Sequence, residues 1–222
     1  MSDDVKIKVI ENGPLRVSGA GLCRIGIETN EHSRPTDYGA ERDQDHAEAY
    51  SLCRCGASSK KPFCDGTHKS IEWDPAETAD RRPTAERQWK VAGDGFEVSD
   101  DKALCWHAGF CVREFGHVWD LTPAAETDED KAQIKQMVQA CPSSRLQYRE
   151  PADSEAIEPE LKPQIATIDD GPFYVQGGIQ IEAADGHQYE RLNRVSLCRC
   201  GLSENKPYCD GAHSKADFKD AG

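Results

Sequence analysis

The chain has 222 residues, of which 37% are hydrophobic and 30% are charged, and its formal net charge is −13. This length suffices for one domain or for two or three small ones, but the few apolar residues favour modules stabilised by metals or disulfides. Because an acidic surface repels phosphate backbones, nucleic acid is excluded as an expected partner, whereas a basic protein face would suit such a surface.

The predicted elements begin with two short β-strands. Lys6 to Ile10 and Leu15 to Val17 have strand-like composition, and Asn12-Gly13-Pro14 between them is a turn signal. The polar segment from Glu28 to Glu48 is predicted to be a surface loop. The sequence CRCGASSKKPFCDGTH then runs from Cys53 to His68.

The middle of the chain differs in composition from the segments on either side. Polar, proline-containing linkers are predicted from Asp74 to Arg87 and from Glu150 to Pro163. The segment between them contains the one convincing predicted helix, with Thr127 or Asp128 as its N-cap. The residues near helical spacing are Ala132, Ile134, Met137, Val138 and Cys141.

The last part of the chain repeats the first. DDGPFYVQG, from Asp169, matches ENGPLRVSG near the start, and CRCGLSENKPYCDGAH, from Cys198 to His213, matches the first cysteine cluster. Ile165 to Ile168, Phe173 to Val175 and Arg194 to Leu197 are predicted strands. One or two helical turns are expected after the Asp-Gly of each copy.

The chain begins with MSDDVKIKVI, which has no basic segment followed by an apolar run. No apolar stretch approaches the ~20 residues needed to span a bilayer. We therefore expect a cytoplasmic protein without a membrane partner. In a reducing compartment, clustered cysteines are more often metal ligands than disulfides.

Both clusters have the spacing Cys-x-Cys-x8-Cys-x3-His. The two cysteines of Cys-x-Cys point to one side of an extended segment, and residues four apart on a helical turn share a face. Four ligands thus converge in two pairs, which fits two bridged irons better than one metal. A structural zinc site is the alternative, although Cys-x-Cys is atypical for zinc. The ligand sets are Cys53, Cys55, Cys64 and His68, and Cys198, Cys200, Cys209 and His213.

Both stretches resemble the CDGSH iron–sulfur family, also called NEET proteins. The family pattern is Cys-x-Cys, a Ser or Thr, Pro-x-Cys-Asp-Gly, a small residue and His, and Thr67 and Ala212 occupy the small position here. The resemblance implies one 2Fe–2S cluster per motif, with the Cys-x-Cys pair on one iron and the Cys-x3-His pair on the other. It also implies an α+β, β-rich fold in which two modules form an intramolecular pseudo-dimer with a β-cap, and hence a monomer.

The histidine of each motif has chemical consequences. Imidazole is a neutral ligand and thiolate an anionic one, so His in place of one Cys is expected to raise the reduction potential. A protonated ring cannot hold iron. We therefore expect the clusters to loosen as the pH falls, and reduction to be coupled to proton uptake.

The middle segment contains Cys105, Cys111 and Cys141, and Pro142 follows the last of them. On the C-x2-C-x2-C template with a distant C-P of bacterial-type ferredoxins, Ala108 stands where the second thiolate belongs. The segment resembles a divergent single-cluster ferredoxin module, and C-x5-C followed by a helix and C-P also resembles small 3Fe–4S ferredoxins. The alternative without a cluster is three cysteines buried in a core.

Two interpretations of this middle cluster stay open. Either the corner iron is absent and the cluster is 3Fe–4S, which we favour because no thiolate stands at the second position, or another group completes a 4Fe–4S cluster. His107 is the nearest candidate for that group, and Cys23 and His117 are more distant ones. Cys23 has no counterpart in the second copy and is otherwise expected to be a core thiol.

We thus predict CDGSH modules at residues 1–76 and 160–222, with a ferredoxin-like module at 86–150 inserted between them. No nucleotide-binding loop, nucleophile elbow or acid–base pair points to an enzyme. The predicted function is electron transfer through three iron–sulfur centres, with a reductase or an oxidase as partner. The alternative is a cluster-transfer or redox-sensing protein that serves apo iron–sulfur acceptors, and a third hypothesis is an inert zinc-stapled binding module.

Overall fold

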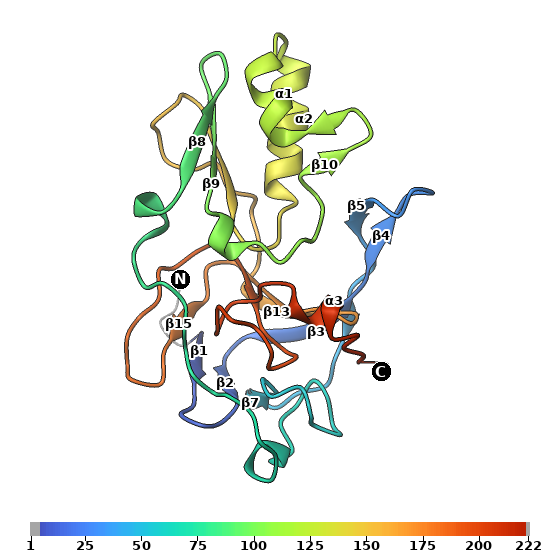
Figure 1. Ribbon diagram of the computed structural model, residues 1–222, viewed down its shortest axis with the longest axis vertical. Coiled ribbons are helices and arrows are strands. Elements are labelled where there is room, and N and C mark those ends of the chain that lie inside the picture. Colours follow the sequence, from blue (N-terminus) through green and yellow to red (C-terminus); the bar gives the residue numbers. More distant parts are fainter. Residues whose placement is uncertain (1–4, 221–222) are drawn as a thin grey trace.

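The computed structural model describes residues 5–220, so the predicted module edges at 1–4 and 221–222 lie outside the described residues. Figure 1 shows the first and last parts of the chain together in the lower half, with the middle segment above them. The fold is mostly sheet with few helices, so the α+β, β-rich class is confirmed. None of the helices formed by residues 5–220 is long and apolar enough to cross a membrane.

Two sheets build the lower half. The first has the order β15-β1-β2-β7, and the second has the order β16-β14-β13-β3-β6. Their strands are β1 (Lys6–Val9), β2 (Leu15–Ser18), β3 (Gly21–Ile25), β6 (Arg42–Asp43), β7 (Ala49–Leu52), β13 (Gln164–Ile168), β14 (Phe173–Gln176), β15 (Gln180–Glu182) and β16 (Arg194–Leu197). The predicted strands near residues 6, 15, 165, 173 and 194 are therefore confirmed.

Each sheet contains strands from both ends of the chain: β15 joins the first sheet, and β3 with β6 joins the second. In the first sheet, β15 pairs in parallel with β1, and Ile181 lies opposite Ile7. In the second sheet, β3 pairs in parallel with β13, and Cys23 lies opposite Ala166. The two ends of the chain consequently build both sheets together.

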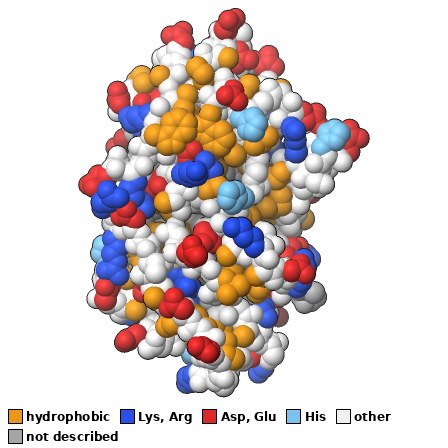
Figure 2. Space-filling model, viewed as in Figure 1, with side chains coloured by type: hydrophobic (Ala, Val, Ile, Leu, Met, Phe, Trp, Pro, Cys, Tyr) orange, Lys and Arg blue, Asp and Glu red, His pale blue; other side chains and the backbone are white. Residues whose placement is uncertain are grey.

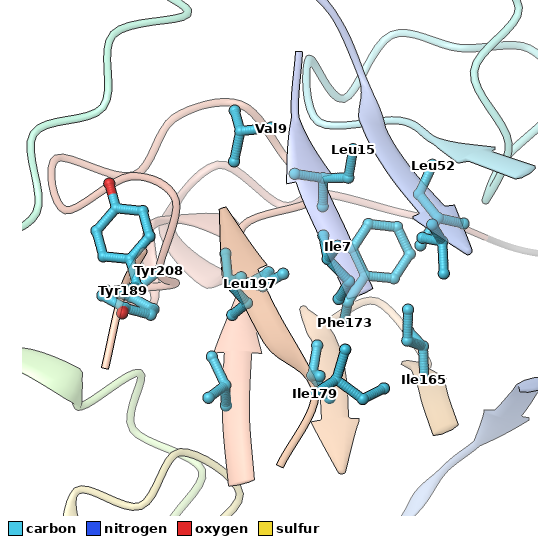
Figure 3. Packing of buried hydrophobic residues seen from close by; sticks show 14 of the residues in the cluster. Ile7, Val9, Leu15, Leu52, Ile165, Phe173, Ile179, Tyr189, Leu197 and Tyr208 are labelled. Carbon is cyan, nitrogen blue, oxygen red and sulfur yellow. The ribbon is translucent and has the colours of Figure 1, made fainter. Parts of the chain in front are cut away.

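The main core lies between these sheets. Apolar residues alternate along β1 and β2, so that Ile7, Val9, Leu15 and Val17 all point to the same buried side. Figure 3 shows Ile7, Leu15 and Leu52 from the first part of the chain beside Phe173, Ile165 and Leu197 from the last part. One hydrophobic core therefore serves both copies of the repeat.

The middle segment forms a small module with its own core. A three-stranded sheet of order β12-β9-β8 packs against two helices. The predicted helix is confirmed as α2, and its first turn is held by Thr127, whose hydroxyl accepts the Asp130 N–H while the Asp130 carboxylate accepts the Thr127 N–H. The sheet and the first helix were not predicted. The elements are β8 (Trp89–Ala92), β9 (Glu97–Asp100), β10 (Val112–Arg113), β11 (Gly116–His117), β12 (Leu146–Arg149), α1 (Val118–Ala124) and α2 (Asp128–Gln139).

The prediction of a surface loop from Glu28 to Glu48 is wrong. The segment contains a hairpin, β4 (Ile27–Thr29) with β5 (Pro35–Tyr38), and then β6, which extends the second sheet. Most of its side chains are exposed, which explains the polar composition, while strand pairing satisfies the backbone. Tyr38 anchors the hairpin, because its ring stacks on Tyr174 and its hydroxyl donates to the Ala140 carbonyl at 2.8 Å.

The first predicted linker is not a free spacer. Its Thr78 and Ala79 amides donate to the Lys206 carbonyl, and its Thr84 amide donates to the Glu190 carboxylate. Short helical turns are η1 (Thr67–Lys69), η2 (Thr84–Glu86) and η3 (Lys102–Leu104), with α3 (Ala212–Lys215) near the end of the chain. Those after each Asp-Gly confirm the expected helical turns.

Candidate metal centres

The first site forms where β7 ends. Strand β7 delivers Cys53 and Cys55, whose sulfurs lie 3.6 Å apart. The chain then returns beside the strand, because the Cys53 amide donates to the Pro62 carbonyl at 2.8 Å. This return brings Cys64 to His68, with 3.4 Å between Sγ and Nδ1. The four donors of the first predicted set are thus brought together as two pairs.

The aspartate of Asp-Gly fixes this loop. The Asp65 carboxylate accepts hydrogen bonds from the Thr67 hydroxyl and amide and from the Ser59 amide and hydroxyl. These hydrogen bonds hold the pKa of Asp65 well below its usual range. Gly66 then takes a φ of 91°, which favours glycine, and the helical turn that carries His68 begins.

The second site repeats this geometry. The Cys198 and Cys200 sulfurs lie 3.8 Å apart, and 3.3 Å separates Cys209 Sγ from His213 Nδ1. Asp210 accepts the Glu204 and Ala212 amides, as Asp65 does in the first copy. The second predicted ligand set is therefore also brought together as two pairs.

The donor distances fit one metal per pair. Two sulfurs bonded at about 2.3 Å to a tetrahedral metal lie about 3.8 Å apart, and a sulfur and an imidazole nitrogen lie about 3.6 Å apart. The four pairs, at 3.3–3.8 Å, are close to these values. Among residues 5–220, no three Cys, His, Asp or Glu side chains gather as a site for a single ion.

An arginine between the two cysteines ties each site to the Gly-Pro turn of its own copy. Arg54 is buried and donates to the Gly13 carbonyl at 2.7 Å and to the Ile10 carbonyl at 3.0 Å. Arg199 donates to the Gly171 and Ile168 carbonyls. This contact explains why the two sequence motifs occur together in each copy.

The two sites lie back to back. A Cβ on Gly201 would lie 2.8 Å from the Cys55 carbonyl oxygen, and a Cβ on Gly56 would collide with the Cys200 carbonyl oxygen. Both glycines have a positive φ, 78° and 80°. The Cys-x-Cys-Gly loop of each copy therefore needs glycine both for its turn and for contact with the other loop.

The three middle cysteines line a single cavity of about 240 Å³. Its walls are mainly apolar, with Phe110 and Trp119 among them. Burial raises the pKa of the Cys111 thiol to about 11. Three thiols that face one apolar cavity fit a group held through sulfur.

Arg145 is the charged partner of this cavity. One guanidinium nitrogen lies 2.7 Å from the Cys105 sulfur, and two others donate to the Asp100 carboxylate at 2.7 and 2.8 Å. Trp119 also donates to Asp100, at 2.9 Å. The arginine is thereby fixed in a position that stabilises a thiolate. Sequence reasoning missed Arg145, which lies 40 residues from Cys105.

The candidates for a fourth ligand differ in position. Ala108 lines the cavity without a donor, as predicted, and His107 lines it too. Cys23 lies buried in β3 and His117 precedes α1; neither lines the cavity. Cys23 is a core thiol, and burial raises its pKa to about 11.

Comparison with known families bears on both repeated segments. A family model described as iron-binding zinc finger CDGSH type matches residues 12–69 and 170–214. This chain belongs to the CDGSH iron–sulfur family.

The middle segment of this CDGSH protein matches a second family. A family model described as divergent 4Fe-4S mono-cluster matches residues 91–151. The uncharacterized protein YjdI of Escherichia coli strain K12 is 37% identical over 60 residues, which are 26% of this chain and 79% of that protein. YjdI of Escherichia coli O157:H7 gives the same values. No solved structure matches the chain significantly.

The middle cavity adjoins the second CDGSH site. Trp106 lines the cavity, and its ring centroid lies 5.5 Å from that of His213. Its indole N–H donates to the Ser196 hydroxyl at 2.8 Å, which in turn donates to the Pro142 carbonyl at 3.0 Å. Strand β16, which leads to Cys198, therefore holds both sides of the cavity.

The two CDGSH sites differ in exposure. All four donors of the second site are buried, whereas Cys55, Cys64 and His68 of the first are only half-buried. Burial lowers the pKa of His213, so its ring favours the neutral form that can bind a metal. Trp106 of the middle segment packs against the second site, whereas the tryptophan against His68 is Trp73, which follows the first site in the chain.

Proposed function

We propose that this CDGSH protein is an electron carrier with a 2Fe–2S cluster in each CDGSH site and a third iron–sulfur cluster in the middle cavity. The single observation that carries the proposal is the arrangement of the eight CDGSH donors as four pairs at 3.3–3.8 Å. A cluster, when bound, supplies one-electron oxidation and reduction. The chain provides the donors and buries all four of them at the second site, and the neutral imidazoles keep each site less negative than four thiolates would.

We infer that the two CDGSH modules form an intramolecular pseudo-dimer with a β-cap, and that the protein is a monomer. Two reciprocal features support this inference. Strands β15 and β3 each join the sheet of the other copy, and Gly56 and Gly201 each contact a cysteine carbonyl of the other copy. Light scattering that gave the mass of a dimer would contradict it.

For the middle site we propose three cysteine ligands, with the insertion as a ferredoxin-like module. Nothing at Ala108 supplies a fourth donor, which favours 3Fe–4S, whereas His107 is the residue that would complete a 4Fe–4S cluster. Mössbauer spectra of anaerobically prepared wild type and His107→Ala distinguish the two. A 4Fe–4S spectrum that is lost only in the variant would assign His107 as the ligand.

A second candidate function is cluster transfer to an apo iron–sulfur acceptor. The exposure of the first site favours it, because the half-buried Cys64 and His68 are accessible to an acceptor's thiols. Mixing the loaded protein with an apo ferredoxin separates the functions. Iron and sulfide that move to the acceptor support transfer, and electrons that move alone support the carrier.

The experiment that tests the proposal as a whole is an anaerobic redox titration followed by EPR, with iron, zinc and acid-labile sulfide measured on the same sample. We expect two 2Fe–2S signals and a third signal of another type. A His68→Cys or His213→Cys variant should keep its iron to lower pH, because a thiolate replaces the ring that acid displaces. Protein with zinc and without sulfide would refute the proposal.

The partner is proposed to be a redox protein, a reductase or an oxidase, rather than a small substrate of an enzymatic reaction. The net charge of −13 favours a basic face on that partner. Weaker association at higher salt concentration would support this, since screening reduces the attraction between opposite charges.

A further inference from the structure

One surface hollow lies between the two CDGSH sites. It measures about 450 Å³ and is lined by Cys55 of the first site and Cys200 of the second. Its walls are the segment that follows the first site and the loop that follows Cys200. A group seated there is therefore next to a ligand residue of both sites at once.

The walls of this hollow are fixed to each other. The Thr78 hydroxyl donates to the Glu204 carbonyl at 2.6 Å, and the Thr78 amide donates to the Lys206 carbonyl at 2.8 Å. The Lys206 amide donates back to the Thr78 hydroxyl. A hollow whose two walls share three hydrogen bonds is formed before any partner arrives, which lowers the entropy cost of binding.

The hollow also concentrates exposed apolar side chains. The large hydrophobic residues with high exposure among the described residues are four, and two of them, Ile71 and Leu202, line this hollow. Leu202 is 56% exposed. The other two, Trp89 and Phe115, belong to the middle segment. Apolar side chains gathered beside a site indicate a contact surface for another molecule.

The charge around the hollow is negative. Glu72, Asp74 and Glu204 line it. Lys206 is the sole basic residue among its described lining residues, but that side chain is 7% exposed and lies 3.7 Å from Asp74, which is 68% exposed. The carboxylates therefore face solvent while the ammonium group does not. Figure 2 shows that apolar, acidic and basic side chains are all interspersed in the lower part of one face of the molecule.

We propose that this hollow is the docking site for the redox partner, and that the partner presents an apolar side chain surrounded by lysines or arginines. The apolar side chain fills the hollow between Ile71 and Leu202, and the basic residues pair with Glu72 and Glu204. The inference rests on the proposed electron-carrier function. One electron leaves the reduced chain and reduces the partner's acceptor, and no bond forms or breaks.

The test uses the loaded full-length protein and ferricytochrome c, a basic one-electron acceptor, as the probe. The dissociation constant is measured at low ionic strength with both proteins oxidised. Leu202→Ala should raise the constant about tenfold, because it removes a central apolar contact. Phe115→Ala is the matched control, since Phe115 is 57% exposed but lies on the middle segment, and it should change the constant less than about twofold.

A second pair of variants tests the charges. Glu204→Gln should raise the constant about threefold and weaken its dependence on salt, whereas Glu129→Gln, on α2, should leave both unchanged. Circular dichroism and iron content verify that each variant is folded and loaded. Equal effects of Leu202→Ala and Phe115→Ala, no effect of Leu202→Ala, or no binding of the probe by the wild type would overturn the inference.

A separate measurement distinguishes failure of the docking-site inference from failure of the proposed function. Ferricyanide is a small anion that does not need a docking surface, and all four variants should reduce it at the wild-type rate. If the variants reduce ferricyanide normally and also bind the probe as the wild type does, the docking site is refuted and the electron-carrier function is not. If the protein reduces neither acceptor, the proposed electron-carrier function is refuted. The binding measurement needs no electron transfer, so it still tests whether the hollow is a docking site.

Discussion

Replacing Arg194 by methionine should separate the middle module from the second CDGSH module. The side chain is fully buried and holds the Glu158 carboxylate with two hydrogen bonds at 2.7 and 2.9 Å. It also donates to the Val138 and Cys141 carbonyls at 2.7 and 2.5 Å and to the Leu146 carbonyl at 3.1 Å. It thus joins β16 to the end of α2 and to the loop of the third middle cysteine.

The expected loss of stability follows from these contacts. Removing Arg194 costs about 4 kcal/mol, because the Glu158 carboxylate, which is 23% exposed, loses its ion pair and the backbone carbonyls lose their donor. For a chain of this size each kcal/mol lowers the midpoint of thermal unfolding by about 2–4 °C, so Arg194→Met should lower it by about 10 °C. The double variant Arg194→Met, Glu158→Gln should recover part of the loss, because the carboxylate is then neutral.

Urea unfolding followed by near-UV circular dichroism, with iron content measured at each step, tests this reasoning. The middle cluster should be lost first, since Arg194 binds the Cys141 carbonyl. Arg191→Met is the control, because Arg191 is exposed three residues earlier, and it should change stability by less than about 0.5 kcal/mol. An Arg194→Met protein within about 1 kcal/mol of the wild type and with full iron would refute the argument.

Two further predictions concern the CDGSH sites. Gly201→Ala should lower the free energy of unfolding by about 3 kcal/mol, because its Cβ would lie 2.8 Å from the Cys55 carbonyl oxygen at a φ of 80°. The control is Gly95→Ala, which also has a positive φ but open space around its Cβ, and it should cost about 1 kcal/mol. Equal losses in the two variants would contradict the steric argument. Because burial lowers the pKa of His213, that ring favours the neutral, metal-binding form down to lower pH, and this stabilisation is lost only as the pH falls below the ordinary range of histidine. On acidification, the second site should therefore keep its cluster to lower pH than the first, as measured by visible absorbance. His68→Cys should lower the pH at which the absorbance is lost more than His213→Cys does. The reverse order would count against the role of burial.

The sequence predicted the CDGSH ligand pairs because their geometry is local. Cys53 and Cys55 are two residues apart, and Cys64 and His68 are four apart, so strand and turn geometry alone brings each pair together. The contact between Trp106 and His213 joins residues more than a hundred positions apart, and no periodicity reports such a contact. The position of the middle cavity, beside the second CDGSH site, could therefore not be predicted from the sequence.

Two misses have different causes. The hairpin formed by β8 and β9 had a signal, because Gly93-Asp94-Gly95 stands between two short stretches of strand-like composition. The hairpin of β4 and β5 had no such signal in the sequence, because its exposed residues are as polar as those of a loop. Its contacts with the rest of the fold explain why the segment is ordered as strands: Tyr38 stacks on Tyr174, and Arg34 donates to the Arg113 carbonyl at 2.8 Å.

The exchange of β3 and β15 between the sheets has a consequence for synthesis on the ribosome. In the first sheet β1 can pair with β2 early, but its other edge lacks β15 until Gln180–Glu182 has left the exit tunnel, more than a hundred residues after the cysteines of the first site were made. A nascent chain consequently exposes thiols and an unpaired strand edge for most of its translation. We therefore expect the first site to take up iron and sulfide only after β15 has been made, and a chain that ends before β15 to leave this sheet incomplete.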